Sequence, residues 1–127
     1  MKKQFLLLLS LLLLIAMSSC SSAKKSSGTV FKKKAIASYY HDKFNGRKTA
    51  SGQKFSNNKY TAAHRKMNFG TKLRVTNLAN LKSVIVIVND RGPFTRGREL
   101  DLSKKAFMDI TDNKNHGTLT VKIEVIK

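Results

Sequence analysis

Apolar and polar residues alternate with a period of two in two segments of this chain. Residues 72–77 (KLRVTN) and residues 118–126 (TLTVKIEVI) follow this pattern, which is typical of β-strands with one buried face. Residues 83–88 (SVIVIV) form a nearly continuous β-branched run that suits a strand with both faces covered. Because only residues 78–82 separate this run from residues 72–77, we expect the two strands to form a hairpin.

Shorter elements complete the predicted fold. Brief strands are expected at residues 35–41, 60–63 and 100–102, and a polar, glycine-punctuated loop at residues 42–53. Ser103 is suited to cap a helix over residues 104–110, because its side-chain oxygen can accept a hydrogen bond from the first turn. Five or six short strands with one or two short helices predict a mainly β protein, and closure into a barrel would remove its exposed strand edges.

The N-terminus has the pattern of an export signal. Lys2 and Lys3 precede an apolar run over residues 5–17, and its 13 residues fall short of the roughly 20 that span a bilayer as a helix. We therefore interpret residues 1–19 as a signal peptide.

Cys20 is the only cysteine, and the small residues before it resemble a bacterial lipobox, in which the cysteine is lipidated. Met17 stands where such motifs favour leucine, and ordinary cleavage near Ala23 is the alternative. Residues 20–34 are rich in Ser and Lys and predict a flexible tether, which leaves residues 35–127 as a single domain. We expect an exported lipoprotein that is anchored through Cys20, faces the periplasm and is delivered to the outer membrane.

The net positive charge of the chain limits the classes of partner that it is expected to bind. The formal net charge is +18, and loss of Lys2 and Lys3 with the signal peptide lowers it to +16. In the cytosol this charge would favour nucleic acid, but export makes anionic envelope polymers the expected partners and excludes nucleic acid. A single cysteine also excludes an internal disulfide.

The end of the β-branched run is the first candidate for a functional site. Asp90 and Arg91 follow the run directly, and Gly92 and Pro93 then stop the strand. A charged group at this position is held by a rigid strand and can still reach a ligand in a loop. The alternative is an ordinary turn-forming Asp beside a surface Arg.

Six short motifs together resemble the RlpA-like (rare lipoprotein A) family in order and spacing. They are ASYY at 37–40, GRKTASG at 46–52, TAAH at 61–64, LRVTNL at 73–78, VNDRGPF at 88–94 and DLS at 101–103. The resemblance implies a six-stranded double-psi β-barrel and an endolytic lytic transglycosylase, which cleaves MurNAc–GlcNAc linkages of peptidoglycan glycan strands to 1,6-anhydro products. It implies no cofactor, and we expect a monomer.

The resemblance and the chemistry of the reaction give three candidate catalytic residues. Asp90 is expected to act first as acid and then as base, since the attacking group is the 6-hydroxyl of the sugar itself. Arg91 faces either Asp90 or the anionic groups of the substrate. His64 either orients Asp90, hydrogen-bonds a sugar hydroxyl or is a buried histidine bound to a backbone carbonyl. Asp101 is either catalytic or a cap for the helix that follows Ser103.

The expected substrate-binding residues are Arg91, Gln53, Thr49, Tyr40 and Phe94. Gln53 stands where the family usually has Glu, so it can hydrogen-bond a sugar but cannot exchange a proton as a carboxylate would. If that Glu is essential, the chain is a non-catalytic peptidoglycan-binding or expansin-like wall module. We expect Phe94 near the glycan groove and Tyr39 in the core. The three histidines have no ligand-like spacing, so no metal site is predicted.

Overall fold

The computed structural model describes residues 26–127. The predicted signal peptide, the lipidation site Cys20 and the first part of the tether lie outside the described residues. Within residues 26–127, no helix has the length and apolar character needed to cross a membrane.

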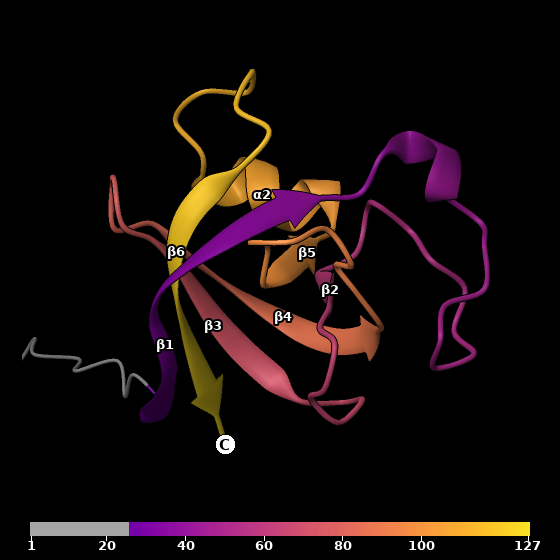
Figure 1. The fold of residues 1–127 in the computed structure, drawn as a ribbon, viewed down its shortest axis with the longest axis horizontal. Helices are drawn as coiled ribbons and strands as arrows, with labels where there is room; N and C mark the ends of the chain where they lie inside the picture. The colour runs from indigo at the N-terminus through magenta and orange to yellow at the C-terminus, as the bar shows by residue number, and fades with distance from the viewer. Residues whose placement is uncertain (1–25) are drawn as a thin grey trace, which may run out of the picture.

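Six strands close into one barrel (Figure 1). They are β1 (Gly28–Tyr39), β2 (Thr61–Ala63), β3 (Lys72–Asn77), β4 (Ser83–Asp90), β5 (Leu100–Leu102) and β6 (Leu119–Ile126). Around the barrel their order is β1-β5-β2-β4-β3-β6, with the β1–β5 and β2–β4 pairs parallel and the other pairs antiparallel. The predicted six-stranded barrel is therefore confirmed.

The elements that were predicted from apolar periodicity or from a helix cap are confirmed. Strand β3 has the predicted bounds and forms the predicted hairpin with β4. The predicted helix is α2 (Lys104–Ile110), and the Ser103 hydroxyl accepts a hydrogen bond from the Ala106 backbone N–H at its start. A short 3₁₀ turn, η2 (Asp42–Phe44), begins the segment between β1 and β2, which extends away from the barrel in magenta in Figure 1.

The predicted boundary between tether and domain is wrong. Strand β1 begins at Gly28 instead of residue 35, and its first half pairs with β6 from Gly28–Ile126 onward. Most side chains in this half are exposed, so backbone hydrogen bonds to β6 hold it in place. An ion pair between Lys32 and Glu99, at 2.8 Å, also connects this half to the residue before β5. A composition rich in Lys does not reveal a strand that is stabilised by its backbone ladder.

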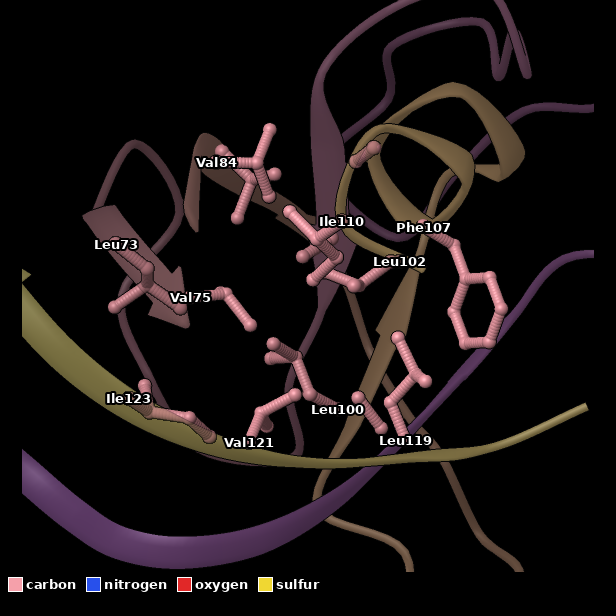
Figure 2. Packing of buried hydrophobic residues seen from close by; sticks show 14 of the residues in the cluster. Leu73, Val75, Val84, Leu100, Leu102, Phe107, Ile110, Leu119, Val121 and Ile123 are labelled. Carbon is pink, nitrogen blue, oxygen red and sulfur yellow. The ribbon is translucent and has the colours of Figure 1, made fainter. Parts of the chain in front are cut away.

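The core fills the inside of the barrel and the space under α2 (Figure 2). Alternate residues of β3, β4, β5 and β6 point inward, and Phe107 and Ile110 of α2 close over them. Tyr39 packs against this cluster at 4.5 Å between its ring centroid and that of Phe107, as predicted for a core residue. The fully buried side chains include Leu73, Val75, Val86, Val88, Leu100, Leu102, Phe107, Ile110, Val121 and Ile123.

A matched pair of leucine truncations should measure how far the barrel depends on this packing. Leu102 is fully buried in β5, and Leu81 is 74% exposed in the β3–β4 turn. We expect Leu102→Ala to lower the free energy of unfolding by about 3–5 kcal/mol because it leaves a cavity, and Leu81→Ala to change it by less than about 0.5 kcal/mol. Urea unfolding of both variants tests this difference, and equal losses would contradict the packing described here.

Candidate functional site

Four residues lie in one row across four neighbouring strands. Ala63 of β2 pairs with Asp90 of β4 on one side and with Asp101 of β5 on the other, and Asp101 pairs with Ser38 of β1. Paired residues on neighbouring strands share a face of the sheet, so the two carboxylates flank the small Ala63 side chain. Two strand spacings separate their Cα atoms, about 10 Å.

An irregularity in strand pairing places Asp90 in this row. Ala62 pairs with Val88, but the next residue, Ala63, pairs with Asp90, so Asn89 is the extra residue of a bulge. Regular alternation would point Asp90 into the core together with Val86 and Val88. The one-residue shift turns its side chain to the opposite face, where Asp101 lies.

Three hydrogen bonds fix the carboxylate of Asp90. Its Oδ1 accepts from the backbone N–H groups of Ala50 and Arg91, each at 2.9 Å, and its Oδ2 accepts from the Tyr40 hydroxyl at 2.5 Å. Burial and the hydrogen bond to Asp90 both raise the pKa of Tyr40, so its hydroxyl keeps its proton and remains a donor. Both oxygens of Asp90 are therefore oriented as acceptors.

Asp101, in contrast to the acceptor Asp90, lies in an environment that favours its protonated form. Burial raises the pKa of Asp101, and the charge of Asp90 raises it further, while a hydrogen bond from Ser38 and the charge of Arg98 lower it. The net effect is upward, which increases the fraction of Asp101 that carries a proton near neutral pH. Its carboxylate accepts from the Ser38 hydroxyl, and Ser103 caps α2 instead, so the helix-cap alternative for Asp101 is wrong.

Thr49 and Gln53 shape the loop that holds Asp90. The Thr49 hydroxyl donates to the Gln53 carbonyl at 2.8 Å, and Thr49 is buried. The Gln53 side-chain oxygen accepts from the Asn89 amide at 3.2 Å, which ties the loop to the bulge. In this structure both predicted substrate-binding residues therefore hold the turn whose Ala50 N–H reaches Asp90.

The ring of His64 points into a separate cluster. Its Nε2 lies 2.8 Å from Glu99 Oε1, and its Nδ1 accepts from the backbone N–H groups of Lys66 and Met67, both at 3.1 Å. Since Nδ1 is an acceptor, Nε2 carries the proton and donates to Glu99. The ring therefore binds Glu99, and only the His64 backbone N–H reaches Asp90, at its main-chain carbonyl. The alternatives in which the ring binds a backbone carbonyl or contacts Asp90 directly are therefore wrong, and a hydrogen bond to a sugar hydroxyl stays a prediction.

Glu99 balances several cations in this cluster. It accepts from Lys32 at 2.8 Å and from Arg65 at 3.1 Å in addition to His64. Burial favours its protonated form, but the hydrogen bonds from Lys32 and His64 outweigh burial and lower the pKa of Glu99. Sequence reasoning missed Glu99, although it lies two residues before Asp101 and so follows the same strand alternation.

Arg91 connects the His64 cluster to the carboxylate row. Its guanidinium donates to the carbonyls of Met67, at 2.7 Å, and His64, at 3.3 Å, and lies 3.9 Å from the ring centroid of Phe69. These contacts contradict the alternative in which the guanidinium faces the Asp90 carboxylate, and its contact with anionic groups of the substrate stays a prediction. Its backbone N–H donates to the Asp90 carboxylate. Since the His64 ring holds Met67 and Met67 binds the Arg91 guanidinium, His64 helps to position the end of β4.

Phe94 projects from the loop beside Asp101. The side chain is 83% exposed, and its ring lies next to Gly92. Gly92 has φ +128°, and a Cβ there would lie 3.7 Å from the Phe94 ring and 3.9 Å from Asp101 Oδ2. The glycine therefore allows the loop to bring an exposed aromatic ring close to the carboxylate row. Residues 26–127 contain no group of three His, Cys, Asp or Glu side chains arranged to hold a metal ion.

Comparison with known proteins assigns the chain to a family. Residues 22–123 match a family model described as lytic transglycolase. The endolytic peptidoglycan transglycosylase RlpA of Pasteurella multocida is 57% identical over 75 residues, which cover 59% of this chain and 26% of that protein. The probable endolytic peptidoglycan transglycosylase RlpA of Treponema pallidum is 54% identical over 87 residues, which cover 68% and 27%. This chain thus spans about a quarter of the length of these relatives.

A solved structure shows the same fold at low sequence identity. The apo expansin of Clavibacter michiganensis superposes with a TM-score of 0.60 at 22% identity, over 76% of this chain and 50% of the expansin. The similarity supports the predicted double-psi β-barrel.

The raised pKa of Asp101 should appear in the stability of the protein. Between its unfolded value of 3.8 and its higher folded value, the folded state binds more protons than the unfolded state, so Asp101 makes the protein less stable as pH rises through this window. Asn does not titrate, so Asp101→Asn lacks this loss of stability. We expect its free energy of unfolding to equal that of wild type below pH 3.8 and to exceed it at pH 7. Urea unfolding over a pH series measures this.

Asp112 offers a control of opposite sign. Hydrogen bonds from Asn80 and Lys82 lower the pKa of Asp112, an exposed residue in the loop after α2 and outside the row. Asp112→Asn should therefore become slightly less stable than wild type as pH rises above 3.8, and the difference should be small because Asp112 is exposed. A loss of stability for Asp101→Asn at pH 7 would contradict the environment described for Asp101.

Proposed function

Since this chain belongs to the lytic transglycolase family, we propose that it is an endolytic peptidoglycan lytic transglycosylase that cleaves MurNAc–GlcNAc linkages to 1,6-anhydro products. The observation that carries this proposal is the pair of carboxylates on either side of Ala63, one with a raised pKa and one held as an acceptor. Pairs of carboxyl groups with divergent environments are typical of glycoside-cleaving sites. The names of the two relatives, which are 57% and 54% identical to this chain over the aligned residues, support the same activity.

The proposed reaction uses Asp101 twice. Protonated Asp101 donates its proton to the glycosidic oxygen, and the bond between that oxygen and C1 of the MurNAc residue breaks. The 6-hydroxyl oxygen of the same sugar then bonds to C1, and its proton returns to Asp101. No water is consumed, and the carboxyl group ends as it began, so a single residue can serve as acid and then as base.

Asp90 has the complementary role in this proposal. Positive charge develops at C1 as the bond breaks, and a fixed carboxylate stabilises it without reorganisation. Hydrogen bonds from Tyr40, Ala50 and Arg91 supply this fixation. This assignment differs from the expectation from sequence, in which Asp90 was the leading candidate for proton transfer and Asp101 was either catalytic or a helix cap.

Other predicted residues act around this pair. Phe94 offers an exposed ring beside Asp101 on which a sugar face can stack. His64, through Lys66, Met67 and Arg91, positions the strand end that carries Asp90 and does not itself contact the reacting atoms. Gln53 serves the loop by accepting from Asn89, a role that needs no proton transfer.

We propose further that the protein is an exported lipoprotein with Cys20 as its lipidated residue. The apolar run over residues 5–17 and the small residues before Cys20 support this location. Its envelope partners would be the glycan strands of peptidoglycan and the membrane, outer rather than inner, and it would act as a monomer without a cofactor.

Digestion of purified sacculi tests the activity. We expect wild type to release fragments with 1,6-anhydro ends, and Asp101→Asn and Asp90→Asn each to lower the rate by about 10²–10⁴-fold, as is usual for loss of an acid or of a charge-stabilising group. Asp112→Asn, at an exposed aspartate on the loop after α2, is the matched control and should keep the wild-type rate. Mass spectrometry of the soluble products identifies the anhydro ends.

Two results would overturn the proposal. Fragments with reducing ends in place of anhydro ends would indicate hydrolysis. Binding of wild type to sacculi without any release would favour the non-catalytic wall module that the neutral Gln53 raises as an alternative.

A further inference from the structure

We propose that a small aromatic pocket beside Asp90 holds the 2-acetamido group of the sugar at the cleavage site, so that cleavage depends on N-acetylation of the glycan. This inference rests on the proposed function and names the group that the site selects. The aromatic pocket is defined by Tyr40, Phe44, Phe55, Thr49 and Asp90, with Arg47 and Lys48 at its rim, and has a volume of about 230 Å³.

The walls of the aromatic pocket are apolar and fixed. The ring centroids of Tyr40 and Phe55 are 4.3 Å apart, and those of Tyr40 and Phe44 are 5.8 Å apart in an edge-to-face arrangement. Phe55 is only 3% exposed, so it is anchored in the domain while one side borders the pocket. Such a surface suits a methyl group, and the methyl of an acetamido group is the apolar part of an otherwise hydrophilic glycan.

Asp90 supplies a polar partner at the end of the aromatic pocket. A carboxylate has about four acceptor sites on its two oxygens. Ala50 and Arg91 occupy both sites on Oδ1, whereas Oδ2 accepts only from Tyr40. One acceptor site on Oδ2 is thus available for the N–H of an acetamido group whose methyl contacts the aromatic rings.

The covalent structure of the sugar brings the acetamido group close to Asp90. The acetamido group is attached to C2, which is bonded to C1, the atom where positive charge develops. A carboxylate that stabilises C1 therefore lies close to the substituent on C2. Asp90 lines the aromatic pocket together with Tyr40 and Thr49. Asp90 can therefore stabilise the charge at C1 and also accept a hydrogen bond from the N–H of the group on C2.

The charged rim disfavours the two closest alternatives to an acetamido group. Arg47 and Lys48 line the pocket, with the Arg47 guanidinium 5.2 Å from the ring centroid of Phe44, and Lys43 Nζ lies 5.3 Å from the same centroid. The ammonium group of a de-N-acetylated sugar is attracted by Asp90 but repelled by these three cations, and it has no methyl to bury. A 2-hydroxyl group can donate to Asp90 but leaves the apolar walls unfilled.

Binding of three hexasaccharides separates these cases without any turnover. The probes are chitohexaose, its fully de-N-acetylated form and cellohexaose, titrated into ¹⁵N-labelled protein. We expect chitohexaose to bind at least about tenfold more tightly than either other probe, since filling an apolar pocket with one carbon discriminates by about that factor. The Ala50 and Phe55 amide signals should shift, while equal affinities, or shifts confined to the His64 cluster, would overturn the inference.

Two variants test whether the aromatic pocket is the source of the selectivity. Phe44→Ala removes a half-buried wall and Phe44→Trp fills the space, and both should reduce the preference for chitohexaose to about threefold or less. Phe31→Ala is the matched control, because Phe31 is a partly exposed ring on β1 beside His64, outside the aromatic pocket. The amide spectra show whether each variant is folded, and an unchanged preference in folded Phe44→Trp would overturn the assignment.

Digestion of native and chemically de-N-acetylated sacculi distinguishes failure of this inference from failure of the proposed function. Rapid cleavage of native sacculi with at least tenfold slower cleavage of the de-N-acetylated material supports both. Equal cleavage of the two substrates overturns the aromatic pocket as a selector and leaves the transglycosylase intact. Selective binding of chitohexaose without cleavage of either substrate overturns the transglycosylase and supports the pocket.

Discussion

The backbone pairing of four strands, β4, β2, β5 and β1, is the constraint on which the site depends. It fixes Asp90, Ala63, Asp101 and Ser38 in one row, so the separation of the two carboxylates is set by strand spacing and not by flexible side chains. Because the barrel is closed, no edge strand can slide to change this register. The one irregularity, at Asn89, is what turns Asp90 out of the core.

Two polar clusters meet at this end of the barrel and have different tasks. In the proposed function the carboxylate row performs the reaction; in the structure the pKa of Asp101 is raised, chiefly by burial, and Asp90 is fixed by three donors. The His64 cluster is an ion-paired support in which Glu99 is kept charged by its cationic partners. Arg91 joins them, with its backbone in the first and its guanidinium bound to carbonyls of the second. A histidine and a carboxylate in neighbouring motifs thus have connected but unequal roles.

Sequence patterns predicted the parts of the structure that depend on local signals. Alternation gave the bounds of β3, and Ser103 marked the start of α2. The motif around Asp90 located the strand end, and the DLS motif supplied Asp101. The first half of β1 could not be predicted because its stability comes from pairing with β6, which is distant in the chain. Glu99 and Ser38 were missed for a related reason, since each acquires its role only when strands β1, β5 and β2 are placed side by side.

The most consequential residue in the row has no functional group at all. Ala63 is fully buried and contributes only a methyl between two carboxylates. Burial is the larger cause of the raised pKa of Asp101, and the charge of Asp90, which lies on the other side of this methyl, adds to it. A larger side chain at this fully buried position would overpack the strand pairing that fixes the two carboxylates, without altering any group that titrates. The positions of the two carboxylates therefore depend partly on an aliphatic residue, whose small buried side chain lets three neighbouring strands pair with both carboxylates on one face.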